Sequence, residues 1–279
     1  MKFTSVLSAS LAFLLTALHA VADTSILFIG NSFTYGWGSS TRHYRADTVT
    51  DLNHEGVGGL DFHLNEKLGV IGRRPWDKVV MHGYSTLDAN SPGDPTELIA
   101  TTAKMAEFLY KLNPDVEVYL TATWSRADLT YQQDRPWFNQ PIYQMAKDVR
   151  EGYDKAASAP AVKSINPVGE AWNRAMEAGI ADPNPYDGAD PNTIDLWTYD
   201  HYHASDYGYY LEALVVFGNV TGLDPRSLGE NECSGYELGM SRPQVSALQQ
   251  TAFEQLASES RVNPAPLVLT EPVASQRCN

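Results

Sequence analysis

The chain has 279 residues and a formal net charge of -14, with 34 acidic and 20 basic side chains. Because a surface this negative repels phosphate backbones and anionic lipids, the composition argues against nucleic-acid binding and favours a neutral substrate. The length suits one large α/β domain that buries a substantial core.

An export signal is predicted at the N-terminus. Lys2 precedes an apolar run over residues 6–21, and the run ends in the small-x-small pattern of residues 20–22. This order is typical of a signal peptide, so residues 1–22 are set apart from a single domain that spans 23–279 and includes a C-terminal extension. The alternative, a membrane anchor, needs an apolar run of roughly 20 residues. We therefore expect a secreted or periplasmic protein without a membrane span.

Export also bears on the two cysteines, Cys233 and Cys278, which both follow the last predicted strand. In an oxidising compartment we expect them to pair and to tie the C-terminal tail back, while two free thiols are the alternative. A glycosylation sequon begins at Asn219 and matters only in a eukaryotic secretory route.

Short apolar, β-rich segments predict the buried strands of a sheet. They cover residues 25–29, 76–81, 116–122 and 161–165, with a further candidate at 48–53. The clearest helix begins near residue 95 and ends before Asn113, and weaker helices cover 138–157, 167–178, 206–221 and 243–258. Strands and helices alternate, which indicates a parallel sheet with helices on both faces. Residues 181–192 are rich in turn formers and predict a long surface loop.

A serine follows the first predicted strand. Residues 30–34 read Gly-Asn-Ser-Phe-Thr, so Ser32 lies just past the strand, at the edge of the sheet where open α/β folds bind ligands. A serine on a tight strand-to-helix turn is exposed, and its own backbone N–H is able to face a developing oxyanion. Ser32 is therefore a candidate nucleophile, and a helix N-cap is the structural alternative.

A candidate base lies near the C-terminus, where residues 200–203 read Asp-His-Tyr-His. With a spacing of three, one turn places the Asp200 carboxylate against a ring nitrogen of His203, which fixes the tautomer and leaves the other nitrogen for a serine hydroxyl. Since a serine hydroxyl is by itself a poor nucleophile, Ser32 requires such a base. We expect an extended segment here, in which alternation points His201 elsewhere.

These two stretches resemble the motifs of the SGNH hydrolases, the superfamily of GDSL-type esterases and lipases. In that family the nucleophile follows the first strand, and an Asp-x-x-His motif near the C-terminus supplies the rest of the triad. The resemblance implies an α/β fold of three layers, an α/β/α sandwich with a central parallel sheet similar to flavodoxin-like folds. It also implies that Ser32 is the nucleophile, His203 the base and Asp200 the residue that orients the base.

The resemblance extends to the oxyanion hole. In the family's second motif a glycine contributes a backbone N–H, and residues 56–60, which read Gly-Val-Gly-Gly-Leu, lie where that motif falls. We choose Gly59 over Gly58 as this donor, beside the N–H of Ser32. The alternative for the segment is a flexible loop.

The family's third motif, Gly-x-Asn-Asp, has an Asn that completes the oxyanion hole, and it is missing from this sequence. Residues 82–85 read His-Gly-Tyr-Ser instead, which resembles a divergent branch where Gln follows the strand and a serine comes three residues later. His82 stands in the Gln position. Because a neutral His donates one ring N–H, we predict His82 as the third donor. The alternative is a strand-end His bonded to a loop carbonyl.

A metal site is one competing interpretation. The cluster of Asp200, His201 and His203 contains plausible zinc ligands, although no other histidine stands in a pair at metal spacing. A further ligand would have to come from His43, His54, His63 or His82.

A non-catalytic carbohydrate-binding protein on a degenerate hydrolase fold is the other alternative. In it, aromatic side chains would serve as sugar-stacking platforms, although such residues are more often core and ordinary surface. The tryptophans concerned are Trp37, Trp124, Trp137, Trp172 and Trp197.

The predicted reaction is acyl transfer to water by an exported serine esterase, without metal or cofactor. Ser32 attacks an ester carbonyl, an acyl-enzyme forms, and His203 activates the water that releases the acyl group. Export and the acidic surface suit a small-molecule or polysaccharide ester, such as an acetylated carbohydrate. The sequence leaves the acyl group, the alcohol and the oligomeric state open.

Overall fold

A four-stranded parallel sheet forms the centre of the computed structural model, which describes residues 24–35, 58–188 and 190–264. In spatial order the strands are β1 (Ile26–Ile29), β2 (Lys78–Met81), β3 (Glu117–Ala122) and β4 (Val162–Pro167). Ile29 pairs with Met81 and Met81 with Leu120, so the carboxyl ends of the first three strands meet at one edge. All four strands lie where the sequence predicts them. The predicted signal peptide and the candidate strand at 48–53 lie outside the described residues.

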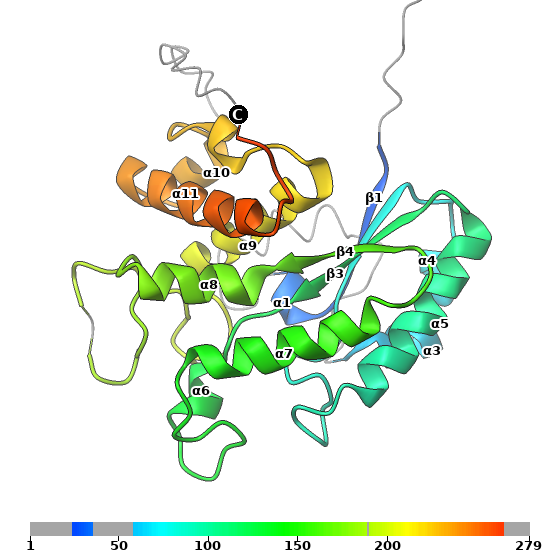
Figure 1. Cartoon of the computed structure of the whole chain (residues 1–279), viewed down its shortest axis with the longest axis horizontal. Coiled ribbons are helices and arrows are strands. Elements are labelled where there is room, and N and C mark those ends of the chain that lie inside the picture. The colour runs from blue at the N-terminus through cyan, green and yellow to red at the C-terminus, as the bar shows by residue number, and fades with distance from the viewer. Residues whose placement is uncertain (1–23, 36–57, 189, 265–279) are drawn as a thin grey trace, which may run out of the picture.

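Helices cover both faces of the sheet (Figure 1). Leu27 and Ile29 pack on the face that carries α3, α5 and α7, whereas Ile26 and Phe28 point to the face covered by α9. The helices of the first face are α3 (Leu60–Glu66), α4 (Leu68–Ile71), α5 (Thr96–Leu112) and α7 (Tyr143–Ala156). Those of the second are α8 (Val168–Glu177), α9 (Asp206–Thr221) and α11 (Arg242–Ser258). The predicted α/β/α architecture is confirmed.

Local capping explains why several helix boundaries agree with prediction. The Asp94 carboxylate accepts the Thr96 N–H at 2.9 Å just ahead of α5, and Ser205 caps α9 by accepting the Gly208 N–H. The predicted helix 138–157 begins later, at Tyr143, because Pro141 has no amide hydrogen for an earlier turn. No helix is predicted where α3 and α4 lie, because both are short and have no side-chain cap.

Four short elements connect or flank the long ones. They are α1 (Ser32–Tyr35), α6 (Ala127–Thr130), the 3-10 helix η1 (Pro225–Leu228) and α10 (Cys233–Glu237). The predicted surface loop is present between Ala181 and Ile194, which pair as an isolated bridge. Cys233 begins α10, and Cys278 lies outside the described residues, so the disulfide stays a prediction.

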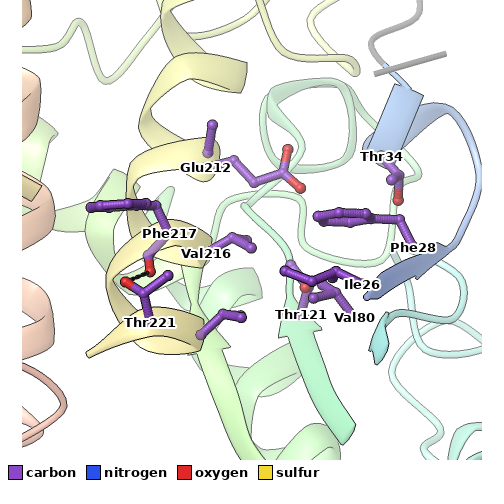
Figure 2. A pocket seen from close by; sticks show the side chains of 11 residues that line it. Ile26, Phe28, Thr34, Val80, Thr121, Glu212, Val216, Phe217 and Thr221 are labelled. Carbon is purple, nitrogen blue, oxygen red and sulfur yellow. Dashed lines mark hydrogen bonds between the residues drawn. The ribbon is translucent and has the colours of Figure 1, made fainter. Parts of the chain in front are cut away.

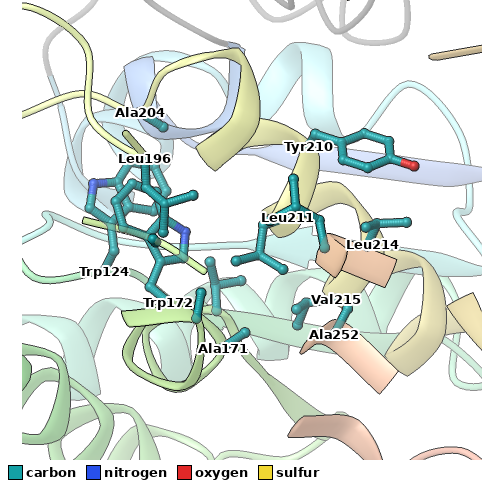
Figure 3. Close-up of a cluster of buried hydrophobic side chains, with 14 of the residues drawn as sticks. Trp124, Ala171, Trp172, Leu196, Ala204, Tyr210, Leu211, Leu214, Val215 and Ala252 are labelled. Atoms are coloured by element: carbon teal, nitrogen blue, oxygen red, sulfur yellow. The ribbon is translucent and has the colours of Figure 1, made fainter. Parts of the chain in front are cut away.

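Four of the five tryptophans named as possible sugar platforms belong to the core, and the fifth, Trp37, lies outside the described residues. Trp124 and Trp172 are fully buried and stacked, with ring centroids 4.7 Å apart, and Trp197 packs edge-on against Trp172. Figure 3 shows Trp124 and Trp172 beside Leu196 and the apolar side chains of α9. Trp137 is also buried, with its ring N–H bonded to a carboxylate. These four rings therefore cannot be sugar platforms, because none is available to a ligand.

Lys78 joins two strands of the sheet to the end of α9. The Lys78 ammonium bonds the Glu117 carboxylate on the next strand and the Val220 carbonyl near the end of α9. The hydrogen bond from Lys78 lowers the pKa of Glu117 to about 2, and the Tyr119 hydroxyl contributes in the same direction. Because the folded-state pKa is depressed, this carboxylate stabilises the fold above its ordinary pKa and loses that contribution as the pH falls through about 2.

We predict that Glu117→Gln lowers the melting temperature at pH 7 and that the gap between variant and wild type closes as the pH falls toward 2. Thermal unfolding monitored by circular dichroism across this range measures both effects. Glu107→Gln is the matched control, because its ion pair with Lys111 is exposed and such pairs contribute little. A gap that stays constant with pH would contradict the proposed role of the Glu117 charge.

Candidate active site

Ser32 is the first residue of α1, immediately beyond the carboxyl end of β1. Asn31 takes the capping position before it, since its side-chain oxygen accepts the Phe33 N–H at 3.1 Å. The backbone carbonyl of Ser32 accepts a hydrogen bond from the Tyr209 hydroxyl at 2.9 Å. The Ser32 hydroxyl therefore does not serve as the helix cap, and it faces His203.

The three residues of the predicted triad lie in one hydrogen-bonded line. His203 Nε2 is 2.8 Å from Ser32 Oγ, and His203 Nδ1 is 2.7 Å from Asp200 Oδ2. Because a carboxylate only accepts, the Nδ1 position carries the proton, and Nε2 is left to accept from the serine hydroxyl. Both distances are within the reach that proton transfer requires.

A tight turn positions Asp200 and His203. Asp200 Oδ1 accepts the backbone N–H groups of Tyr202 and His203, each at 2.9 Å, while His201 has a left-handed backbone with φ of 54°. The expectation of an extended segment is wrong here, because the carboxylate bonds favour a turn over strand-like alternation. The His201 ring lies instead against Tyr186 of the surface loop, with centroids 4.3 Å apart.

The same hydrogen bonds decide the ionisation of Asp200. Burial acts to raise the pKa of this carboxyl, but the hydrogen bonds from the His203 ring and from the two backbone N–H groups outweigh burial. The pKa of Asp200 therefore lies below its ordinary value. Asp200 stays ionised at neutral pH, the form in which it orients and stabilises a cationic imidazole.

Aromatic rings hold His203 from the side. The Tyr202 ring centroid is 4.1 Å from that of His203, and the Arg126 guanidinium lies 3.6 Å from the Tyr202 ring. Phe33 stacks on Trp124 at 4.4 Å, and the Trp124 ring N–H donates to the Tyr202 carbonyl at 3.2 Å. These contacts tie the turn that carries His203 to the core.

Asn31 joins three segments beside Ser32. Its amide nitrogen donates to the Gly58 carbonyl at 2.9 Å and to the Gly83 carbonyl at 3.3 Å. Asn31 was not among the predicted site residues, although an amide side chain next to the candidate nucleophile just after a strand was a usable signal.

Gly59 is buried directly before α3, and the Tyr84 ring packs on it so closely that a Cβ there would lie 2.6 Å from a ring carbon. A side chain at this position would require the Tyr84 ring to shift, and the Asn31 bond to Gly58 brings the segment to the Ser32 turn. The oxyanion role of Gly59 itself stays a prediction.

His82 is buried and has other partners than the predicted oxyanion. Its Nδ1 lies 2.9 Å from the Gly83 carbonyl, and its Nε2 lies 2.6 Å from the Thr34 hydroxyl. Since a carbonyl only accepts, Nδ1 carries the proton of the neutral ring and Nε2 accepts from Thr34. The geometry thus matches the alternative, a strand-end His bonded to a loop carbonyl, and leaves the neutral ring no N–H for an oxyanion.

Within the described residues, no group of three or more His, Cys, Asp or Glu side chains is arranged to hold a metal ion. His203 bonds Ser32 and Asp200, and His63 bonds the Gly30 carbonyl at 2.7 Å. His43 and His54 lie outside this part of the chain. None of the helices in the described ranges has the length and apolarity needed to cross a membrane.

An apolar pocket of about 230 Å³ lies between α9 and the sheet. Figure 2 shows Val216 and Phe217 of α9 on one side of it and Ile26 and Phe28 of β1 on the other. Neither Ser32 nor His203 lines the pocket, and among the described lining residues Thr34, the partner of His82, is the one that contacts the site. The candidate active site therefore lies at the sheet edge and not in this pocket.

Comparison with solved structures finds a protein with a similar fold and others that are more distantly similar. A DUF4886 family protein from Bacteroides uniformis aligns over 86% of this chain and 97% of its own, with a TM-score of 0.58 and 15% identity. A candidate SGNH hydrolase from Slackia heliotrinireducens aligns over 69% of this chain and 96% of its own, with a TM-score of 0.48 and 21% identity. A GDSL-like lipase from Bacteroides thetaiotaomicron aligns over 71% of this chain and 88% of its own, with a TM-score of 0.39 and 17% identity. No family model and no curated protein matches the sequence.

We predict that Asn31→Ala lowers the free energy of unfolding by about 1–3 kcal/mol, because it leaves the buried Gly58 carbonyl without its side-chain donor and removes one of the two donors to the Gly83 carbonyl, whose other donor is His82. Urea unfolding followed by tryptophan fluorescence measures the change. Asn90→Ala is the control, since Asn90 is exposed and such substitutions usually stay within about 0.5 kcal/mol. Equal stability of the two variants would show that the Asn31 amide does not hold these segments.

Proposed function

We propose that the chain is an exported serine esterase, a divergent member of the SGNH hydrolases, which cleaves carboxylic esters through an acyl-enzyme on Ser32. The observation that carries this proposal is the line of hydrogen bonds from Ser32 through His203 to the ionised Asp200. A serine hydroxyl needs an adjacent base, and the base needs a group that fixes its tautomer. These requirements are met by three residues at the sheet edge where α/β folds bind ligands.

In the proposed first step, the Ser32 hydroxyl oxygen adds to the ester carbonyl while its proton passes to His203 Nε2. Asp200 stabilises the imidazolium that forms. The oxyanion of the tetrahedral intermediate accepts hydrogen bonds from the backbone N–H groups of Ser32 and Gly59. As the intermediate collapses, the C–O bond to the alcohol breaks and the alcohol leaves with the proton from His203.

The second step repeats the chemistry with water. His203 Nε2 takes a proton from the water as its oxygen adds to the acyl carbonyl, and the proton then returns to the Ser32 oxygen as the acid departs. Every proton and bond is accounted for by the ester, the water and these residues. The reaction requires neither metal nor cofactor.

The surroundings of the triad favour a sugar-linked ester among the possible substrates. Tyr199 directly precedes Asp200 and is 78% exposed, and Tyr186 is 41% exposed beside His201. Exposed phenol rings combine an apolar face with a hydroxyl, which suits a sugar ring. The acidic chain fits a neutral ester better than a phosphate. We therefore propose an acetylated saccharide as the substrate class.

We predict that the wild type hydrolyses a short-chain aryl ester and that Ser32→Ala and His203→Ala each lower kcat/KM by several orders of magnitude. The two losses should be similar and the double variant little worse, because the pair acts as one unit. Initial rates of phenol release measure the effect, and the same variants are then assayed on acetylated sugars.

His201→Asn is the matched control, because Asn tolerates the left-handed backbone of this position and the triad is untouched. It should retain activity within a few-fold, and a chelator should leave the wild type active. If chelation abolishes turnover while Ser32→Ala retains it, a metal-dependent hydrolase replaces this proposal. Binding of acetylated sugars without any turnover would instead favour a carbohydrate-binding protein.

A further inference from the structure

Two side chains of one chain segment contact Ser32 at different atoms. His203 Nε2 lies 2.8 Å from Ser32 Oγ, and the Tyr209 hydroxyl donates to the Ser32 backbone carbonyl at 2.9 Å. His203 and Tyr209 lie 171 and 177 positions from Ser32 along the chain, so they are close neighbours in sequence. The segment that supplies the base therefore also holds the backbone of the nucleophile.

The connection between His203 and Tyr209 is held firmly in place. Ser205 caps α9, and its N–H donates to the Leu196 carbonyl at 2.8 Å. A Cβ at Gly208 would lie 2.3 Å from that same carbonyl oxygen, so the first turn of α9 packs directly against the segment before the triad turn. Because this connection is fixed, His203 and Tyr209 keep a constant separation.

The peptide unit between Ser32 and Phe33 is bonded at both ends. Its carbonyl accepts from the Tyr209 hydroxyl, and its N–H donates to the Asn31 side-chain oxygen at 3.1 Å. A peptide unit is planar and includes the Cα atoms on both sides, so these two bonds fix the Ser32 Cα, from which the side chain begins. The Ser32 hydroxyl is thereby kept in reach of His203.

The Tyr209 side chain is itself held in the core. It is fully buried, and its ring lies edge-on to the Trp124 ring, with centroids 5.8 Å apart. The Phe33 ring stacks on the same tryptophan. A tyrosine held in this way presents its hydroxyl at a fixed place, so the bond to Ser32 needs no rearrangement as the reaction proceeds.

We propose that Tyr209 is a positioning residue, whose hydroxyl holds the Ser32 backbone so that Oγ stays within proton-transfer distance of His203 Nε2. This inference rests on the proposed esterase function. Tyr209 acts through Ser32 and not through the substrate, so the bonds and proton transfers of the proposed reaction are unchanged. A misplacement of about 1 Å at the reacting atoms is enough to lower a rate about 100-fold, which gives this bond its importance.

Tyr209→Phe tests the role, because it keeps the buried ring and removes only the hydroxyl. We expect kcat on a short-chain aryl ester to fall about 10- to 100-fold, with KM changed by less than about three-fold, because the nucleophile alone is misplaced. Labelling of Ser32 by an aryl phosphonate should slow by a similar factor. The midpoint of the profile of kcat/KM against pH should not move, since the bond between His203 and Asp200 is kept.

Tyr210→Phe is the matched control. Tyr210 is the next residue of α9 and is also buried, but its hydroxyl accepts a hydrogen bond from Gln249 of α11 at 3.3 Å. This variant should lose thermal stability to a similar degree and keep its kcat. In a third variant, 4-aminophenylalanine in place of Tyr209 returns a hydrogen-bond donor to the same position and should recover most of the lost kcat.

Several results would overturn the inference. If Tyr209→Phe loses stability but keeps its kcat, or does not fold, the hydroxyl serves the core alone. An equal loss of kcat in Tyr210→Phe would show a general response of α9, and a 4-aminophenylalanine variant no better than Tyr209→Phe would show that the donated hydrogen has no part. A shifted pH midpoint would place the effect on His203 instead of Ser32.

The activity of Ser32→Ala separates this inference from the function on which it rests. If Ser32→Ala is inactive and Tyr209→Phe is as active as the wild type, the esterase stands and the positioning role is wrong. If Ser32→Ala retains the wild-type activity, the proposed function itself fails.

Discussion

The side-chain amide of Asn31 is the constraint on which the geometry of the site depends. Its oxygen accepts the Phe33 N–H and its nitrogen donates to the Gly58 and Gly83 carbonyls. The turn after β1, the segment before α3 and the end of β2 are thereby fixed around one buried group. A buried amide that lacks a hydrogen-bond partner destabilises the fold, because it has lost its hydration without replacement. Few other arrangements of these three segments would satisfy the Asn31 amide. Ser32 is held at the sheet edge as a consequence.

A second constraint comes from the Asp200 carboxylate, whose two oxygens have different partners. Oδ1 accepts two backbone N–H groups and shapes the turn, and Oδ2 accepts the ring nitrogen of His203. The bonds that form the turn therefore also keep the carboxylate ionised and aimed at the imidazole. The Tyr202 ring, which contacts both Arg126 and His203, limits the remaining freedom of the histidine.

His82 illustrates how burial decides the use of a polar side chain. The ring is 2% exposed and lies between the Gly83 carbonyl and the Thr34 hydroxyl. Both ring nitrogens must find partners in such a place, since an unpaired buried polar group is costly. The nearest partners belong to the protein, so the ring links the end of β2 to α1. Tyr84, two residues later, packs its ring on Gly59.

The sequence by itself determined the features that depend on local spacing. The strand ends, the helix from residue 206 to 221 and the three-residue separation of Asp200 and His203 follow from hydrophobic runs, caps and turn chemistry. Only the tertiary structure decided which distant side chains meet. The contact between His203 and Ser32 joins residues 171 positions apart, and the partners of His82 and the packing of Tyr84 on Gly59 depend on which loops share the sheet edge. No local pattern encodes these pairings, because they arise from the register of parallel strands and from the need to satisfy every polar group that the packing buries.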